Sequence, residues 1–195
     1  MIALLLDTSN TNLSVGLAQD HHLLDEIQYD AWQQQSEFLV QEIANILDKN
    51  HIERKQIDEI IVSKGPGSYT GVRIAMTVGK TMAFALNKPL FLVSSLEVYK
   101  KGSDRSVCLM NARSKRSYIG VYQGDEILLP DTIMENDQIR LYLAAHPDYK
   151  VCGDVSYLQM KGEQVDLLEN LMNADIMRNK VTEVLSAKPV YLKDL

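Results

Sequence analysis

Apolar and polar positions along the first third of the chain predict a small antiparallel sheet. Residues Ile2 to Leu6 form a short continuous apolar run, which is typical of a central strand buried on both faces. Leu13, Val15 and Leu17 alternate with polar residues, and residues 22–29 continue an extended pattern after a polar turn. These segments predict three strands joined as a meander.

Two helices with wide apolar faces follow the meander. The first is expected from Ser36 to about Lys49 and the second from about Gly71 to Asn87. Short apolar, β-branched runs at residues 59–63 and 90–93 flank the second helix, so strand, glycine turn, helix and strand form a βαβ crossover. The resulting order of three strands, helix, strand, helix and strand is the ribonuclease H-like succession.

A weaker copy of the same succession occupies the rest of the chain. Its expected strands are residues 107–111, 118–122, 126–129 and 150–152, and its expected helices are residues 135–145 and 174–185. We predict an N-terminal half of residues 1–103 and a shortened C-terminal half of residues 104–195, joined at a polar segment that contains Gly102. Two such halves predict an α/β actin-like fold, the architecture in which actin, Hsp70 and sugar kinases hold a nucleotide between the halves.

The second helix carries a ridge of small residues. Four of them recur at every fourth position: Gly71, Ala75, Gly79 and Ala83. A ridge without bulk lets another element approach closely, although a glycine inside a helix costs roughly 1 kcal/mol of helix propensity. Two interpretations remain open, namely packing inside the subunit and an interface with another helix pair.

Composition narrows the class of protein. The chain has 195 residues, 46% of them apolar, and a net charge of −6, which indicates a globular, soluble protein. Without an apolar run of membrane length or a secretory signal, the expected location is the cytoplasm and no membrane partner is expected. The acidic balance argues against binding nucleic acid by general electrostatics. Cys108 and Cys152 are expected to be reduced, buried thiols.

The first candidate chemistry lies at the end of the first strand, where Asp7, Thr8 and Ser9 occupy the place of the first phosphate loop of an actin-like enzyme. The alternative is an ordinary Asx or Ser/Thr turn. Gly65 and Gly67 belong to the string GPGSYTG, which opens a helix whose N-terminus could attract an anion. These five residues are candidates for a degenerate phosphate site.

A working ATP cleft needs a second glycine turn in the other half, but residues 111–116 contain no glycine. Arg113, Lys115 and Arg116 in this segment are the best candidates for a local contact with nucleic acid, and a solvated hairpin is the other interpretation. The four histidines lack metal-ligand spacing, and no nuclease or covalent-hydrolase pattern is present. We therefore expect no catalytic residue, no metal and no cofactor in this chain.

Several strings resemble the TsaB family, also called YeaZ. They are IALLLDTS at residues 2–9, GPGSYTGVRI at residues 65–74 and Pro89 with VSSLE at residues 93–97, followed more weakly by residues 111–113 and Pro189 with Tyr191. The resemblance implies an actin-like fold that has lost its own catalysis. It also implies a scaffold role beside a TsaD-like catalytic subunit and a TsaE-like ATPase, which together place threonylcarbamoyl on the adenosine next to the tRNA anticodon.

The resemblance further implies that the first two helices form a four-helix interface, used for the TsaD-like partner or for a homodimer when the chain is alone. The expected interface residues are Ser36, Val40, Ala44, Gly71, Val72, Ala75, Met76, Gly79 and Ala83. The alternative function is an actin-like ATPase or small-molecule kinase with its own nucleotide site.

Overall fold

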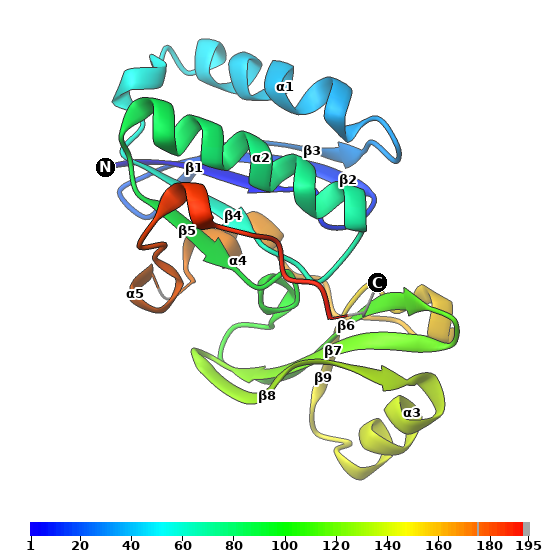
Figure 1. Cartoon of the computed structure of the whole chain (residues 1–195). Coiled ribbons are helices and arrows are strands. Elements are labelled where there is room, and N and C mark those ends of the chain that lie inside the picture. The colour runs from blue at the N-terminus through cyan, green and yellow to red at the C-terminus, as the bar shows by residue number, and fades with distance from the viewer. Residues whose placement is uncertain (175, 193–195) are drawn as a thin grey trace.

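The structure, a computed structural model, describes residues 1–174 and 176–192 and contains two β-sheets with helices packed on them (Figure 1). The first sheet has the order β3-β2-β1-β4-β5, and the second has the order β8-β7-β6-β9. The strands of the first sheet are β1 (Ile2–Asp7), β2 (Asn12–Gln19), β3 (His22–Asp30), β4 (Glu59–Ser63) and β5 (Leu90–Val93). The strands of the second are β6 (Arg105–Arg113), β7 (Arg116–Gln123), β8 (Glu126–Glu135) and β9 (Lys150–Gly153).

The helices divide unevenly between the sheets. The α-helices are α1 (Gln35–Lys49), α2 (Tyr69–Leu86), α3 (Asn136–Ala145), α4 (Leu167–Met172) and α5 (Ile176–Asn179). Short 3-10 turns are η1 (Arg54–Gln56), η2 (Glu97–Tyr99), η3 (Ser156–Leu158) and η4 (Val184–Ser186). Helices α1 and α2 lie side by side on one face of the first sheet, whereas α3 covers the second sheet (Figure 1).

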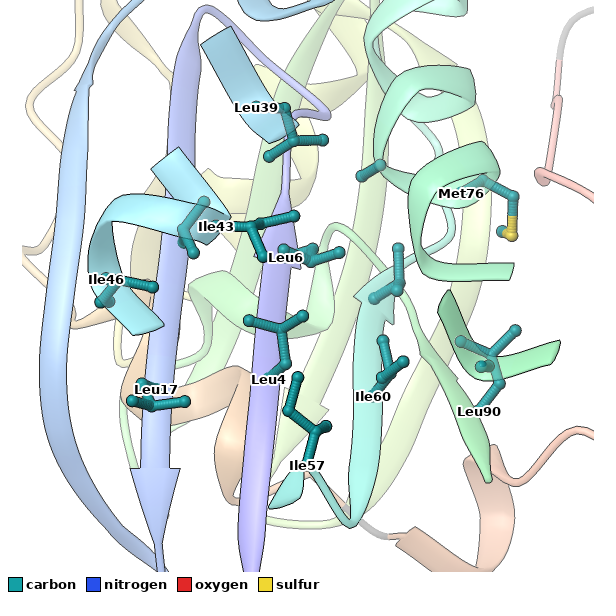
Figure 2. Close-up of a cluster of buried hydrophobic side chains, with 14 of the residues drawn as sticks. Leu4, Leu6, Leu17, Leu39, Ile43, Ile46, Ile57, Ile60, Met76 and Leu90 are labelled. Carbon is teal, nitrogen blue, oxygen red and sulfur yellow. The ribbon is translucent and has the colours of Figure 1, made fainter. Parts of the chain in front are cut away.

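The first sheet is built around β1, which pairs antiparallel with β2 and parallel with β4. Both faces of β1 are buried, and this accounts for its unbroken apolar sequence. Figure 2 shows Leu39 and Ile43 of α1 and Met76 of α2 packing over the face that carries Leu4 and Leu6. The meander, both helices and the βαβ crossover of the first half are confirmed.

The second sheet repeats the order of the first with one strand fewer. Its central strand β6 pairs antiparallel with β7 and parallel with β9, as β1 does with β2 and β4. One face packs on α3, and the other turns toward the first half, where it packs with Leu96 and Leu192. Cys108 and Cys152 are paired across β6 and β9 and are buried as free thiols. The predicted α/β fold of two ribonuclease H-like halves, the second shortened, is confirmed.

The end of the chain departs from the prediction of one helix over residues 174–185, a range whose residue 175 lies outside the described residues. Helix α4 comes earlier, capped by Asp166, and buries Leu168 and Leu171 on the far face of the first sheet. Beyond α5 the chain runs beside β5, with the amide of Val181 donating to Leu90 O at 2.9 Å. The apolar residues of α4 fill the uncovered face of the first sheet, whereas Val181, Val184 and Ala187 pack with the cluster beneath α1 and α2, and this packing overrides the helical pattern.

Charged groups tie the halves together at η2. Glu97, whose side chain is 4% exposed, accepts a hydrogen bond from Arg178 and lies 3.6 Å from Lys100 Nζ. Lys100 Nζ also donates to Gly124 O at 2.9 Å and to Asp125 Oδ1 at 3.2 Å in the β7–β8 turn. The predicted boundary at residue 103 stays a prediction, because the second sheet starts at β6 while α4 and α5 return to the first half.

Candidate functional site

The carboxylate at the end of β1 is enclosed by its own half. Asp7 is 1% exposed and accepts hydrogen bonds from the hydroxyl of Ser63 on β4 and from the amide of Ser9 at 3.3 Å. Burial raises the pKa of Asp7 above its ordinary value, and the hydrogen bonds from Ser63 and Ser9 oppose that rise. The acid that would hold a hydrated cation in an actin-like enzyme is thus enclosed by the strand next to it.

Thr8 connects the end of β1 to the first turn of α2. Its hydroxyl donates to Gly71 O at 2.6 Å and accepts from the amide of Ala75 at 3.1 Å. Those two backbone groups are four residues apart, and in a regular helix they would bond to each other. The Thr8 side chain is therefore inserted into the helix ladder, and its hydroxyl has no hydrogen-bonding capacity directed toward a phosphate.

The glycine loop closes directly over the turn between β1 and β2. The amide of Ser68 donates to Ser9 O at 2.8 Å, and a Cβ on Gly67 would lie 2.3 Å from that same oxygen. Gly65 has φ +99° and lies so close to the C-terminal segment that a Cβ there would meet Val190 O at 2.6 Å. The glycines serve close packing of backbone on backbone, and the loop surrounds protein atoms.

The matching turn of the second half is open and cationic. Residues Arg113, Ser114 and Lys115 all have positive φ angles, between 52° and 59°, in the β6–β7 hairpin. The amide of Arg113 donates to Asn111 Oδ1 at 2.8 Å, which folds the turn back on its own strand. All four of these residues are exposed. The hairpin of residues 111–116 contains no glycine, and the degenerate phosphate site stays a prediction.

A cleft of about 660 Å³ lies between the glycine loop and this hairpin. Its polar lining includes Asn10, Gln33, Gln35, Asn111, Arg113 and Asp154, and its apolar and aromatic lining includes Trp32, Tyr69, Ile74, Met110 and Tyr118. Of the five phosphate-site candidates, Gly67 lines this cleft, whereas Asp7, Thr8, Ser9 and Gly65 do not. Across residues 1–174 and 176–192, no group of three or more histidine, cysteine or acidic side chains is placed to bind a metal ion.

The small-residue ridge of α2 faces inward, which corrects the predicted interface. Six of the expected interface residues are buried by the chain itself: Gly71, Val72, Ala75, Met76, Gly79 and Ala83. A Cβ on Gly79 would lie 2.5 Å from Val62 Cγ2, and one on Gly71 would lie 2.0 Å from Thr8 O. The ridge therefore lets α2 approach its own sheet, and the alternative of packing inside the subunit is the correct one for these residues.

An apolar stripe nevertheless lies on the outward side of the two helices. Val40 is 62% exposed, and Ser36 and Ala44 lie on the same stripe of α1 as Val40. The facing stripe of α2 consists of half-buried residues at every fourth position, namely Ile74, Val78 and Met82. We refer to Val40, Ala44, Ile74, Val78 and Met82 as the α1–α2 surface. Sequence reasoning missed its α2 members, although their four-residue spacing was the available signal.

Within residues 1–174 and 176–192, no helix is both long enough and apolar enough to cross a bilayer.

Comparison with known proteins gives a consistent family. Residues 29–188 match the family described as "TsaD: tRNA N6-adenosine threonylcarbamoyltransferase". The chain is 31% identical over 141 residues to the tRNA threonylcarbamoyladenosine biosynthesis protein TsaB of Bacillus subtilis, a match that covers 70% of this chain and 62% of the relative. TsaB of Buchnera aphidicola (Baizongia pistaciae) is 37% identical over 86 residues, covering 44% of this chain and 38% of that protein. Among solved structures, YeaZ from Pseudomonas aeruginosa superposes with a TM-score of 0.82 at 26% identity, covering 98% of this chain and 99% of that one.

Proposed function

This chain belongs to the TsaD family, and from that premise we propose that it is a non-catalytic subunit of a tRNA threonylcarbamoyl-transferring complex. It acts together with a TsaD-like catalytic subunit and a TsaE-like ATPase, and it contacts tRNA through that complex in the cytoplasm. The product is threonylcarbamoyladenosine at the adenosine next to the anticodon. The match to TsaB, whose name states a part in threonylcarbamoyladenosine biosynthesis, supports this role, and the similarity to YeaZ over nearly the whole chain supports the shared fold.

One observation carries the non-catalytic part of the proposal. Two groups at the end of β1 that could hold a cation and a phosphate are used inside the fold, since the carboxylate of Asp7 accepts from Ser63 and the hydroxyl of Thr8 bridges Gly71 and Ala75. A catalytic carboxylate must reach the reacting groups, directly or through a metal or one water. Asp7 is 1% exposed and does not line the cleft.

The alternative of an ATPase or small-molecule kinase has less support for the same reason. The phosphates of a nucleotide in the cleft would lie opposite Gly67 and Ser68. The amide of Ser68 already donates to Ser9 O, so it is not available to a phosphate. Phosphate cradles need free amide N–H groups converging on the anion. The closed glycine loop offers few of them.

The α1–α2 surface supports the partner contact. The exposed side chain of Val40 and the half-buried apolar side chains beside it on α1 and α2 form a surface that another helix pair can cover. We propose that the TsaD-like subunit covers it in the complex and that a second copy covers it when the chain is alone. The buried ridge of α2 contributes by holding α2 in place, and the contact itself is made by Val40, Ala44, Ile74 and Val78.

Reconstitution tests this function. The purified chain, a TsaD-like subunit, a TsaE-like subunit, tRNA and the donor substrates are combined, and threonylcarbamoyladenosine is measured after digestion of the tRNA. We expect no product without the chain and normal product with Asp7→Asn, because that carboxylate has no catalytic task. Loss of transfer with a folded Asp7→Asn variant, or ATP hydrolysis by the chain alone that this variant abolishes, would contradict a non-catalytic role.

A further inference from the structure

The cleft between the halves gathers exposed aromatic rings from distant parts of the chain. Trp32 follows β3 and is 45% exposed, Tyr69 begins α2 and is 44% exposed, and Tyr191 lies near the end of the chain and is 38% exposed. The rings of Tyr69 and Tyr191 lie 5.0 Å apart. Trp32 and Tyr69 line the cleft itself. Solvent-exposed rings at the entrance of a polar cleft offer flat faces on which a nucleobase can stack.

Cationic side chains lie on both sides of these rings. Arg73 stacks over the Tyr69 ring at 4.7 Å from its centroid and donates through Nη1 to Tyr69 Oη at 2.9 Å. On the opposite side, Arg113 lines the cleft, and Lys115 and Arg116 follow in the same hairpin. This cluster stands out in a chain whose net charge is −6. Two flanking cations suit a phosphate backbone that passes across the entrance.

The interior of the cleft suits a base rather than a phosphate. Its volume of about 660 Å³ lies in the range of small-molecule sites. Ile74 and Met110 supply apolar lining, and Gln33 and Asn111 supply amide groups able to pair with base edges. Asp154 is the carboxylate among the described lining residues, and it can accept from an exocyclic amino group while it repels a phosphate.

We propose that this cleft receives one unstacked base of a single-stranded RNA segment, with the base against Tyr69 and Trp32 and the flanking phosphates on Arg73 and Arg113. The proposal rests on the proposed function, which supplies an RNA substrate. It commits to an RNA strand rather than a free mononucleotide because the sealed glycine loop leaves no phosphate site inside the cleft. Arg113 lines the cleft on the side of the hairpin and Arg73 lies over Tyr69, so a strand that continues beyond the bound base would meet both cations.

Tryptophan fluorescence provides a direct readout, because Trp32 is the single tryptophan of the chain. The full-length chain is titrated with a short single-stranded oligoadenylate, with a duplex RNA of equal length and with AMP. We expect a saturable change in Trp32 emission with the single strand, and binding of the duplex and of AMP at least roughly tenfold weaker. No emission change with the single strand, or equal affinity for AMP, would overturn the proposal.

Paired variants locate the binding. Tyr69→Leu should weaken single-strand binding roughly 5- to 150-fold, the range for loss of one stacking ring, whereas Tyr29→Leu, which removes an exposed tyrosine from β3, should leave it unchanged. Arg113→Ala should lower the slope of log K against log salt by about 0.7, and Arg105→Ala at the other end of β6 should not change it. Circular dichroism checks that each variant is folded. Equal effects within either pair would place the RNA elsewhere and overturn the assignment.

The two proposals fail separately. If the isolated chain binds no single-stranded RNA but remains necessary for transfer in the reconstituted complex, the cleft assignment is wrong and the proposed function stands. If the chain binds single-stranded RNA with the expected variant pattern but is dispensable for transfer, the cleft assignment stands and the proposed function is wrong.

Discussion

The two halves end their central strands in opposite ways. In the first half, β1 runs into a turn whose acid, hydroxyl and carbonyl are all bonded to β4, α2 and the glycine loop. In the second half, β6 runs into an exposed hairpin in which Arg113 and Lys115 face solvent. In the same topology, one strand end is thus bonded into its own half and the other is exposed to solvent. Equivalent positions in a duplicated fold need not retain equivalent tasks.

Glycine substitutions should break this comparison most strongly. Gly71→Ala puts a Cβ 2.0 Å from the backbone oxygen of Thr8, which cannot rotate away, and we expect a loss of about 3 kcal/mol of unfolding free energy. Gly124→Ala in the β7–β8 turn meets nothing within 4 Å and carries only the cost of φ +56°, about 1 kcal/mol. Urea denaturation measures both. Equal losses would mean that the first strand end is not the tighter of the two.

A charge on the α1–α2 surface should have the next largest effect, on association. Val40→Glu places a carboxylate at a side chain that is 62% exposed, so the fold is kept while partner binding or self-association weakens by about 2 kcal/mol, roughly 30-fold. Leu141→Glu on α3, at a residue 72% exposed, is the matched control in the second half. Sedimentation of each variant, alone and with the TsaD-like subunit, gives the result. If Leu141→Glu weakens association as much as Val40→Glu, the contact surface includes α3.

Removing the Thr8 hydroxyl sharpens the comparison at a single side chain. Thr8→Val leaves the amide of Ala75 without its 3.1 Å partner inside α2, and we expect a loss of about 1.5 kcal/mol. Thr11→Val, three residues along, removes an exposed hydroxyl and should change stability by less than about 0.5 kcal/mol. Thermal denaturation of the pair distinguishes them. An unchanged melting temperature for Thr8→Val would show that the amide of Ala75 bonds directly to Gly71 O when the hydroxyl is absent.

The smallest expected effect is a gain in stability at Asp7. Because burial raises the pKa of Asp7 in the folded state, the folded chain holds that proton more tightly than the unfolded chain does. Stability from this group is complete below the ordinary value of 3.8 and is lost as the pH rises through the raised pKa. Asp7→Asn should therefore be the more stable protein at neutral pH, with the difference vanishing in acid. A variant that melts lower at pH 7 would show that the hydrogen bonds from Ser63 and Ser9 outweigh burial.

Sequence periodicity predicted the elements of the first half because each has a clear apolar pattern, such as the run of Ile2 to Leu6. It could not decide which side of α2 faces inward. The helix has small apolar residues on one side and Ile74, Val78 and Met82 on another, so the 3.6-residue period is satisfied by either orientation. The close approach of Gly79 to Val62 shows that the side with small residues faces inward. This contact between α2 and β4 exists only in the folded structure, so the sequence pattern does not reveal it.

The cleft was harder to predict than the strand ends. Asp7, Thr8 and Ser9 stand together in the sequence, but Trp32, Tyr69 and Tyr118 belong to three separate segments that meet only after both halves fold. Helix α4 was missed for a related reason. Its apolar residues pack on the face of the first sheet that α1 and α2 leave uncovered, which includes residues of β1, β2 and β4 more than 100 positions earlier in the chain.

The return of α4 to the first half has a consequence for biosynthesis. Leu5 and Ala18 form a cluster with Leu168 and Leu171, although the two pairs are far apart in the sequence and leave the ribosome at different times. Until α4 has been synthesised, one apolar face of the first sheet stays exposed to solvent. A chaperone could shield that face in the nascent chain. The first sheet therefore gains its second packing layer only after α4 has been synthesised.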